Sequence, residues 1–415
     1  MLLPSDGEST SASAEVGGGS GSGDAAGGSS GGSGSMTWHA AAMSLRADEV
    51  ALASRWRKST CIEDVLYLHS DHLMSLQLHN GKLISASADH TIRVTDVSGT
   101  ALREQANAFL SSGAKSFVPR HSVTLTGHGD QVMHAHACNA GGGEDVLASC
   151  SADGTVGIWS LGESPALLRQ WPKMEAYCVQ LDPTRLICGG EGTRPIAMYD
   201  WRSGKQLHTF EDDEPPLGVC CSLHRAGLAL AAGNTFSRSQ LRVWDLPTGA
   251  MVDRFTLPAA CRGVRCVQLL PEEHGLIAGC ANGWIVWCDL RCGRFEKKMA
   301  HAECVNSVQL RGGKLVTAAD DGLVRITDAR NFAVSIGAHR LKRVVFSACC
   351  DDERLFAGCD DGTVHMFDYS AAAAAALHAR EQGGGFSVQQ KEAFGAAIEA
   401  ARRRANASYS SSVFQ

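Results

Sequence analysis

Histidine, serine and aspartate occur along this chain in an order that could support acid–base and nucleophilic chemistry. His128, Ser149 and Asp153 combine the three residue types of a catalytic triad. Similar sets recur at intervals, with further histidines, His301 and His339, ahead of expected strands. Repetition at a fixed period is typical of a structural element rather than of a single active site.

Motifs of catalytic and nucleotide-binding sites are missing from the expected strands and helices. Neither G-x-S-x-G nor G-x-G-x-x-G follows an expected strand, and H-E-x-x-H and the P-loop motif are absent. The glycine runs at 17–34 and 141–143 have the low complexity of a tail and a loop. We therefore expect no catalytic residue, no cofactor and no enzymatic activity.

Cysteine is frequent enough to raise the question of metal binding or disulfides. The chain has 16 cysteines, but no C-x-x-C pair, and neither Cys288/Cys292 nor Cys261/Cys266 has a second ligand pair at the spacing of a zinc site. We expect free thiols buried in strands, no metal site, and a reducing compartment.

Composition is that of a globular protein without a charge bias. The 415 residues are 44% hydrophobic and 20% charged, with a formal net charge of −6, which does not favour nucleic-acid binding. No apolar stretch is long enough for a membrane span, and the first residues lack the pattern of a secretory signal. The expected location is the cytoplasm, the nucleus, or both.

The two ends of the chain differ from its middle. Residues 1–35 are Gly- and Ser-rich with four acidic residues and no Lys or Arg, so we expect a disordered tail. Residues 36–60 carry apolar residues at helical spacing, including Trp56, and predict a short helical segment. Residues 370–415 predict an Ala-rich linker followed by a helix over 387–404.

The middle, residues 61–369, repeats. A short strand recurs seven times, and each copy ends in a pair of residues, an aromatic residue or a substitute followed in most copies by Asp. The second residues of successive pairs are 64, 40, 45, 44, 39 and 40 positions apart. This is the period of a four-stranded propeller blade, and the long first step accommodates an insertion at 101–118. The pairs are Thr95-Asp96, Trp159-Ser160, Tyr199-Asp200, Trp244-Asp245, Cys288-Asp289, Thr327-Asp328 and Phe367-Asp368.

Hairpin signals support the repeat. Asp153-Gly154, Asn282-Gly283, Asp321-Gly322 and Asp361-Gly362 stand six residues ahead of the aromatic position, and such dipeptides mark tight turns between strands. No strand pattern follows Phe367-Asp368, so the last blade lacks its outer strand. We expect residues 64–68 to supply it and close the ring.

These residues closely resemble the WD-repeat family over about residues 64–368, which implies an all-β, seven-bladed WD-repeat β-propeller. The resemblance also implies a buried hydrogen-bonded relay in the second blade formed by His128, Ser149, Asp153 and Trp159. Proteins of this design bind other proteins, so the resemblance implies a non-enzymatic protein–protein interaction scaffold.

Two weaker resemblances suggest an alternative function, that of a substrate receptor of a cullin-type or F-box-type ubiquitin ligase. Arg202, Arg291 and Arg330 each follow a strand-ending Asp by two residues, similar to the D-x-R box of receptors that bind a cullin-ligase adaptor. Residues 53–57 resemble the segment that joins an F-box to its propeller, although no F-box precedes it.

A second candidate surface lies around the central channel. The residues just before two of the hairpin turns are acidic, Asp320 and Asp360, and Glu303 is expected nearby, together with Arg262 and Lys342. With no arginine at the equivalent turn positions, this ring favours a basic peptide segment over a phosphorylated one as the partner.

Overall fold

Antiparallel strands dominate the computed structural model. It describes residues 49–98, 122–190, 196–210, 218–222, 228–234, 240–258, 260–270, 275–329, 331, 334–371, 373, 374 and 377. These residues all belong to one compact unit, 49–415, which is separate from residues 1–48. The predicted tail at 1–35, the insertion at 101–118, the helix over 387–404 and Arg330 lie outside the described residues. The domain boundaries 1–35, 36–60, 61–369 and 370–415 stay predictions.

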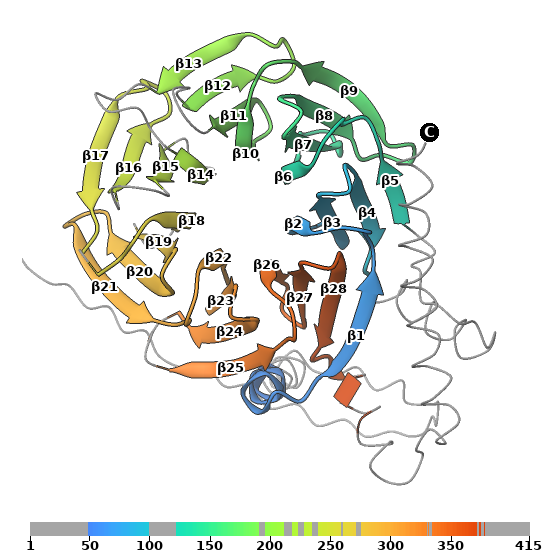
Figure 1. Cartoon of the computed structure of the whole chain (residues 1–415), viewed down its shortest axis with the longest axis vertical. Helices are drawn as coiled ribbons and strands as arrows, with labels where there is room; N and C mark the ends of the chain where they lie inside the picture. Colours follow the sequence, from blue (N-terminus) through green and yellow to red (C-terminus); the bar gives the residue numbers. More distant parts are fainter. Residues whose placement is uncertain are drawn as a thin grey trace, which may run out of the picture. The chain divides into compact units, whose positions relative to one another are not determined.

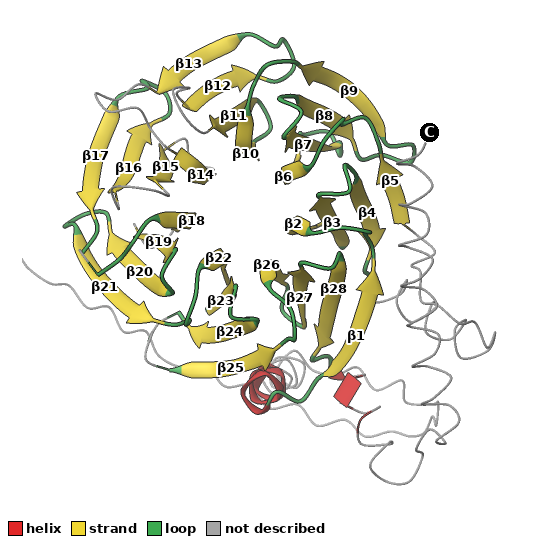
Figure 2. Ribbon diagram, viewed as in Figure 1, coloured by secondary structure: helices red, strands yellow, loops and turns green. Residues whose placement is uncertain are grey.

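The described strands form seven four-stranded sheets, here called blades (Figures 1 and 2). Blade 1 contains β2 (Leu73–His79), β3 (Lys82–Ser87), β4 (Ile92–Asp96) and β5 (Ser122–Leu125); blade 2 contains β6 (Val132–Asn139), β7 (Asp145–Ser151), β8 (Val156–Ser160) and β9 (Ala166–Trp171). Blade 3 contains β10 (Ala176–Leu181), β11 (Arg185–Gly190), β12 (Ile196–Asp200) and β13 (Gln206–Phe210); blade 4 contains β14 (Gly218–Ser222), β15 (Leu228–Asn234), β16 (Gln240–Asp245) and β17 (Met251–Thr256). Blade 5 contains β18 (Val264–Leu270), β19 (Gly275–Cys280), β20 (Trp284–Asp289) and β21 (Arg294–Met299); blade 6 contains β22 (Val305–Arg311), β23 (Lys314–Ala319), β24 (Leu323–Asp328) and β25 (Ser335–Arg340). Blade 7 contains β26 (Val345–Cys350), β27 (Arg354–Cys359), β28 (Thr363–Asp368) and β1 (Ile62–Tyr67).

The blades form a closed ring. Each innermost strand packs against the innermost strand of the next blade, and β26 packs against β2 (Figure 1). The turns between second and third strands and the connections between blades lie on one face, here called the top face. The turns joining first to second and third to fourth strands lie on the opposite, bottom face. The prediction of an all-β propeller is confirmed.

The predicted hairpin turns occur where Asp-Gly was found. Gly322 and Gly362 adopt φ of 72° and 77°, a conformation that favours glycine. A Cβ on Gly362 would stand 2.4 Å from the carbonyl oxygen of His69, so the position also lacks room for a side chain. In blade 1, where no glycine is present, His90 takes the same conformation with φ of 69°.

Blade 7 is completed by the chain segment that precedes blade 1. β1 pairs antiparallel with β28, with Leu66 opposite Val364 and Ile62 opposite Asp368. Leu66 is fully buried in a core cluster that also holds Leu73 of blade 1. The predicted closing strand over 64–68 is confirmed, with bounds shifted to 62–67.

Within the predicted helical segment 36–60, the described part is helical over residues 49–58. Trp56 is 2% exposed and stacks on Tyr369, with ring centroids 3.8 Å apart. Its Nε1 donates to the carbonyl of Asp352 at 2.9 Å, and the Lys314 ammonium lies 4.5 Å from the ring centroid. The helix therefore anchors on the bottom face between blades 6 and 7.

Deleting residues 1–67 should open the ring, whereas deleting residues 1–48 should not. The longer deletion removes β1 and the helix, exposes the edge of β28, and loses the burial of Trp56 and Leu66, so we expect a loss of about 5 kcal/mol or more. Thermal melting followed by circular dichroism measures this. Equal melting temperatures for the two deletions would show that closure does not depend on β1.

Candidate functional site

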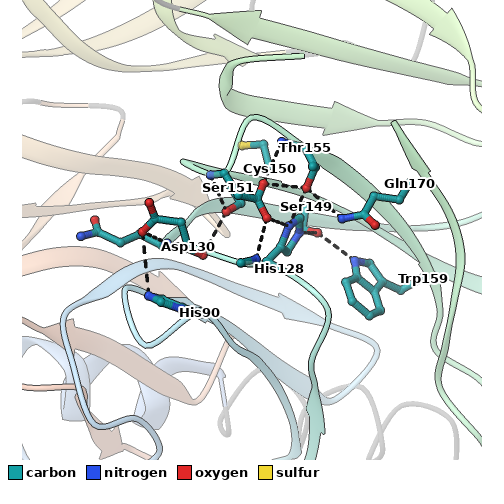
Figure 3. Close-up of polar contacts among 12 residues, drawn as sticks. His90, His128, Asp130, Ser149, Cys150, Ser151, Thr155, Trp159 and Gln170 are labelled. Atoms are coloured by element: carbon teal, nitrogen blue, oxygen red, sulfur yellow. Dashed lines mark hydrogen bonds and ion pairs between the residues drawn. The ribbon is translucent and has the colours of Figure 1, made fainter. Parts of the chain in front are cut away.

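The four residues predicted to form a relay in blade 2 are linked by hydrogen bonds, and Figure 3 shows His128, Ser149 and Trp159 among them. Ser149 Oγ, on β7, lies 2.7 Å from His128 Nε2 and accepts a hydrogen bond from Trp159 Nε1 at 2.8 Å. His128 Nδ1 lies 3.3 Å from Asp153 Oδ2 and 2.9 Å from Thr155 Oγ1. The network thus links the connection before β6, the β7 strand, the β7–β8 turn and the β8 strand.

Burial sets the charge state of this network. Burial lowers the pKa of His128 although Asp153 opposes that shift. Burial alone would raise the pKa of Asp153, but hydrogen bonds from Thr155 and from the Gly129 amide lower it to about 2. The site therefore holds a neutral imidazole beside a carboxylate at neutral pH.

The same arrangement superficially matches a hydrolase triad, but the serine has no access to a substrate. Ser149 is 0% exposed, and its oxygen is shared between His128 and Trp159. A nucleophile needs room for a reacting carbon beside it. What this arrangement can do is hold the top-face connection of blade 2 in place.

Two further blades carry a network of the same design. In blade 1, His69 binds Ser85 at 2.8 Å and Asp89 at 2.9 Å. Sequence reasoning missed His69, although it stands four residues before its strand, as His128 does. In blade 6, His301 binds Thr317 at 2.8 Å and Asp321 at 3.1 Å. Threonine replaces tryptophan at the aromatic position in both blades, as the sequence indicated.

The interpretation of His339 as the corresponding histidine of blade 7 is wrong. His339 lies within β25 of blade 6, stacks on Phe367 with ring centroids 3.9 Å apart, and hydrogen-bonds the Tyr369 hydroxyl. Leu341 occupies the position four residues before β26. The error arose because His339 follows Ala338, as His301 follows Ala300, but two residues too early in the repeat.

The arginines of the D-x-R boxes differ in their availability. Arg202 donates to the carbonyls of Pro183, at 2.5 Å, and Ala140, at 2.9 Å, and so ties blade 3 to blade 2. The Arg291 side chain is 65% exposed and forms a bidentate pair with Asp289.

The acidic residues predicted around the channel lie on the top face. The amides of Asp320 and Asp360 donate to the carbonyls of Cys304 and Val344, which places both residues beside the starts of β22 and β26. Asp320 Oδ1 accepts from Asn306 Nδ2 at 2.6 Å, whereas Asp360 Oδ1 is buried without a hydrogen-bond partner. The other predicted members of this surface are exposed: Arg262, Glu303 and Lys342.

Metal sites and membrane-spanning helices are absent from the described part of the chain. No group of three or more His, Cys, Asp or Glu side chains there is placed to hold a metal ion. Cys350 and Cys359 are free thiols, and burial raises the pKa of Cys350 to about 11 and that of Cys359 to about 12. No described helix has the length and apolar character needed to cross a membrane.

Comparisons with known proteins agree with this architecture. Residues 119–160 match the family model described as WD domain, G-beta repeat. The chain is 23% identical over 275 residues to ribosome biogenesis protein ytm1 of Schizosaccharomyces pombe, which covers 57% of each chain. It is 26% identical over 314 residues to the YTM1 protein of Coccidioides immitis, covering 64% of this chain and 62% of the relative. Autophagy-related protein 16 of Arabidopsis thaliana is 21% identical over 194 residues, 44% of this chain and 37% of the relative. The chain therefore spans about three fifths of the length of the first two relatives.

Ser149→Ala should destabilise the fold by about 2 to 4 kcal/mol, because it leaves His128 Nε2 and Trp159 Nε1 buried without a partner. The midpoint of denaturant unfolding measures the loss. Ser164→Ala, in the exposed turn of the same blade, is the matched control and should stay within about 0.5 kcal/mol of the wild type. Equal midpoints for the two variants would contradict a stabilising role of the relay.

Acidification should lower stability from about pH 6.5 downwards. Burial lowers the folded-state pKa of His128 and His301. In the unfolded chain these histidines have the ordinary histidine pKa of about 6.5, so below about pH 6.5 the unfolded chain binds more protons than the folded chain. Stability is therefore lost as the pH falls. Between pH 7.5 and 5.5, the melting temperature of the double variant His128→Gln, His301→Gln should fall less than that of the wild type. His72→Gln, whose side chain is 53% exposed, is the control and should follow the wild type. A double variant with the wild-type pH dependence would refute this assignment.

Proposed function

Because the chain is a β-propeller of the WD-repeat family, we propose that it is a non-enzymatic scaffold that binds other proteins on its top-face loops. The observation that carries the proposal is the contrast in burial between its polar groups. The histidine and serine groups that could do chemistry are hydrogen-bonded inside the blades, whereas Arg262, Glu303 and Lys342 on the top face are exposed. Rigid strands presenting exposed loops suit recognition rather than turnover.

The relatives suggest the kind of assembly in which such a scaffold acts. Two of them are named ribosome biogenesis proteins, and we infer that this chain also serves in the assembly of a large particle of that kind. The sequence left the cytoplasm and the nucleus open as locations, and a role in ribosome biogenesis favours the nucleus. Imaging of the tagged full chain tests that location directly.

The acidic pair of blades 6 and 7 is the part of the top face that we propose for partner binding. Asp320 and Asp360 lie in adjacent blades, and Asp360 has a buried oxygen without a donor. A Lys- or Arg-rich segment would supply donors to both carboxylates. Glu303 would add to the attraction, and Arg262 and Lys342 would limit it.

The ubiquitin-ligase alternative is less well supported. Of the three D-x-R arginines, Arg202 is engaged with backbone carbonyls and Arg330 lies outside the described residues. The exposed Arg291 on the bottom face favours the alternative, because its guanidinium could exchange Asp289 for a carboxylate of an adaptor.

Affinity purification of the tagged full chain, followed by mass spectrometry, separates these functions. We expect ribosome-assembly proteins to co-purify and to be reduced at least fivefold in the double variant Asp320→Lys, Asp360→Lys. Asp130→Lys, the same charge change at a more exposed top-face residue of blade 2, is the control and should retain them. A cullin-ligase adaptor among the partners, lost in Arg291→Ala, would instead establish the alternative. Absence of reproducible protein partners would refute both.

A further inference from the structure

Asp320 and Asp360 occupy the same place in blades 6 and 7, but their carboxylates differ in hydrogen bonding. The amide of Asp320 donates to Cys304 and that of Asp360 to Val344, in each case the residue just before the innermost strand. Asp320 Oδ1 accepts from Asn306 Nδ2 at 2.6 Å. Asp360 Oδ1 is buried and has no hydrogen-bond partner among the described residues. Blade 7 therefore carries an unsatisfied acceptor that blade 6 does not.

The difference arises at the β-bulge of the innermost strand. The pairing of β22 with β23 and that of β26 with β27 each shift register after the first residue, so each innermost strand has one extra residue there. That residue is Asn306 in blade 6 and Phe346 in blade 7. A phenyl ring has no donor, so Phe346 cannot hold Asp360 as Asn306 holds Asp320.

The repeat places the ring of Phe346 beside Asp360 on the top face. Asn306 reaches from its own blade to the next, since its Nδ2 also lies 3.1 Å from the carbonyl oxygen of Val345. Phe346 likewise meets the next blade, where its ring lies at 78° to that of His72 with centroids 6.0 Å apart. Phe346 and Asp360 are both partly exposed. A cation that reaches Asp360 from the top face therefore also meets an aromatic ring.

Asp360 has no ion-pair partner in the described part of the chain. Arg343, which precedes β26, pairs with Asp361, with its Nε 3.3 Å from Oδ2. Five blades have a described turn between their second and third strands, and in three of them alanine takes the place of the acid: Ala88, Ala152 and Ala281. Among these five blades, an unsatisfied carboxylate and an aromatic bulge residue coincide in blade 7 alone.

We propose that Asp360 and Phe346 bind the guanidinium group of an arginine in a partner polypeptide. The carboxylate accepts from the guanidinium fork, and the ring stacks on the guanidinium plane. The carboxylate can turn towards a donor that arrives from solvent, because the χ2 torsion of aspartate is broad. An ammonium is more strongly hydrated and has no plane to stack, so such a site favours arginine over lysine. The choice of a polypeptide rests on the proposed protein-binding function, which this site narrows to one anchoring side chain.

Fluorescence anisotropy with labelled twelve-residue peptide libraries tests the proposal on the full chain. Each library has two fixed lysines and a central arginine, lysine or citrulline, and the libraries are otherwise identical. Citrulline keeps the shape of arginine without its charge. We expect the arginine library to bind at least threefold more tightly than the lysine library and at least tenfold more tightly than the citrulline library. Binding should weaken with salt.

Exchanging the two bulge residues provides matched variants. Phe346→Asn removes the ring and introduces the donor that blade 6 already has, so it should weaken binding of the arginine library at least fivefold. Asn306→Phe frees the carboxylate of Asp320 beside a new ring and should strengthen that binding at least twofold. Met133→Leu is the control, because Met133 is the bulge residue of blade 2, where the turn has Ala152 in place of the acid. It should bind as the wild type does.

Each other outcome for the peptides overturns the arginine site. Equal binding of the arginine and lysine libraries would mean general attraction by acidic residues. Unchanged binding in Phe346→Asn, or no gain in Asn306→Phe, would show that an unpaired carboxylate beside a ring is not what selects arginine. Should Phe346→Asn fail to fold, Phe346→Leu decides, because it keeps an apolar side chain without an aromatic ring. An undiminished preference for arginine over lysine in that variant refutes the proposal.

The arginine site and the scaffold function can fail separately. Partners of the full chain that are lost in Asp320→Lys, Asp360→Lys but kept in Phe346→Asn would refute the arginine site and leave the scaffold function standing. The expected peptide preferences without any reproducible protein partner would support the site and contradict the scaffold function.

Discussion

The pairing of β1 with β28 is the constraint on which the rest of the structure depends. A propeller gains its stability from blade-to-blade packing, so an incomplete last blade would leave an unpaired edge and an uncovered apolar face. Two segments that flank the pairing reinforce it. Trp56 precedes β1 and stacks on Tyr369, which follows β28, and Arg55 Nε donates to the carbonyl of Tyr369 at 2.6 Å. The two ends of the propeller are thus fastened to each other on the bottom face.

Closure allows the innermost strands to be tied to one another around the channel. Gln77, Gln268 and Gln309 each accept, through Oε1, a hydrogen bond from the innermost-strand amide of the next blade, at 2.5 to 2.6 Å. These bonds satisfy amides that have no sheet neighbour on the channel side. They also fix the angle between blades, so the top-face loops are held in defined positions before any partner arrives. Binding on such a surface costs less ordering entropy than binding by a flexible segment.

Most of the fold could be predicted from the sequence, because recurring short strands that end in an aromatic residue and Asp, and the Asp-Gly turns before them, are properties of neighbouring residues. The blade 2 network was predictable through its resemblance to a family. His69 and His339 show the limit of this reasoning, since the position of a histidine relative to its strand matters more than its neighbour in sequence. Contacts such as Trp56 with Asp352, separated by 296 positions, leave no local signal at all. The same is true of Arg202, whose acceptor carbonyls belong to two different blades.

The departures from the repeat have physical consequences of their own. In blade 2 the indole ring of Trp159 fills the space beside β8. Residue 157 there is glycine, and a Cβ on Gly157 would lie only 2.9 Å from the indole nitrogen. Threonine at the same position in blades 1 and 6 removes that bulk, and an arginine stands two residues upstream in both. The long aliphatic stem of arginine can replace indole as packing material, but it brings a charge to the blade interface. In blade 1 the neighbouring strand offers Leu66 to that arginine, whereas in blade 6 it offers Lys298. Packing by the aliphatic stem therefore accounts for an arginine at this position in both blades.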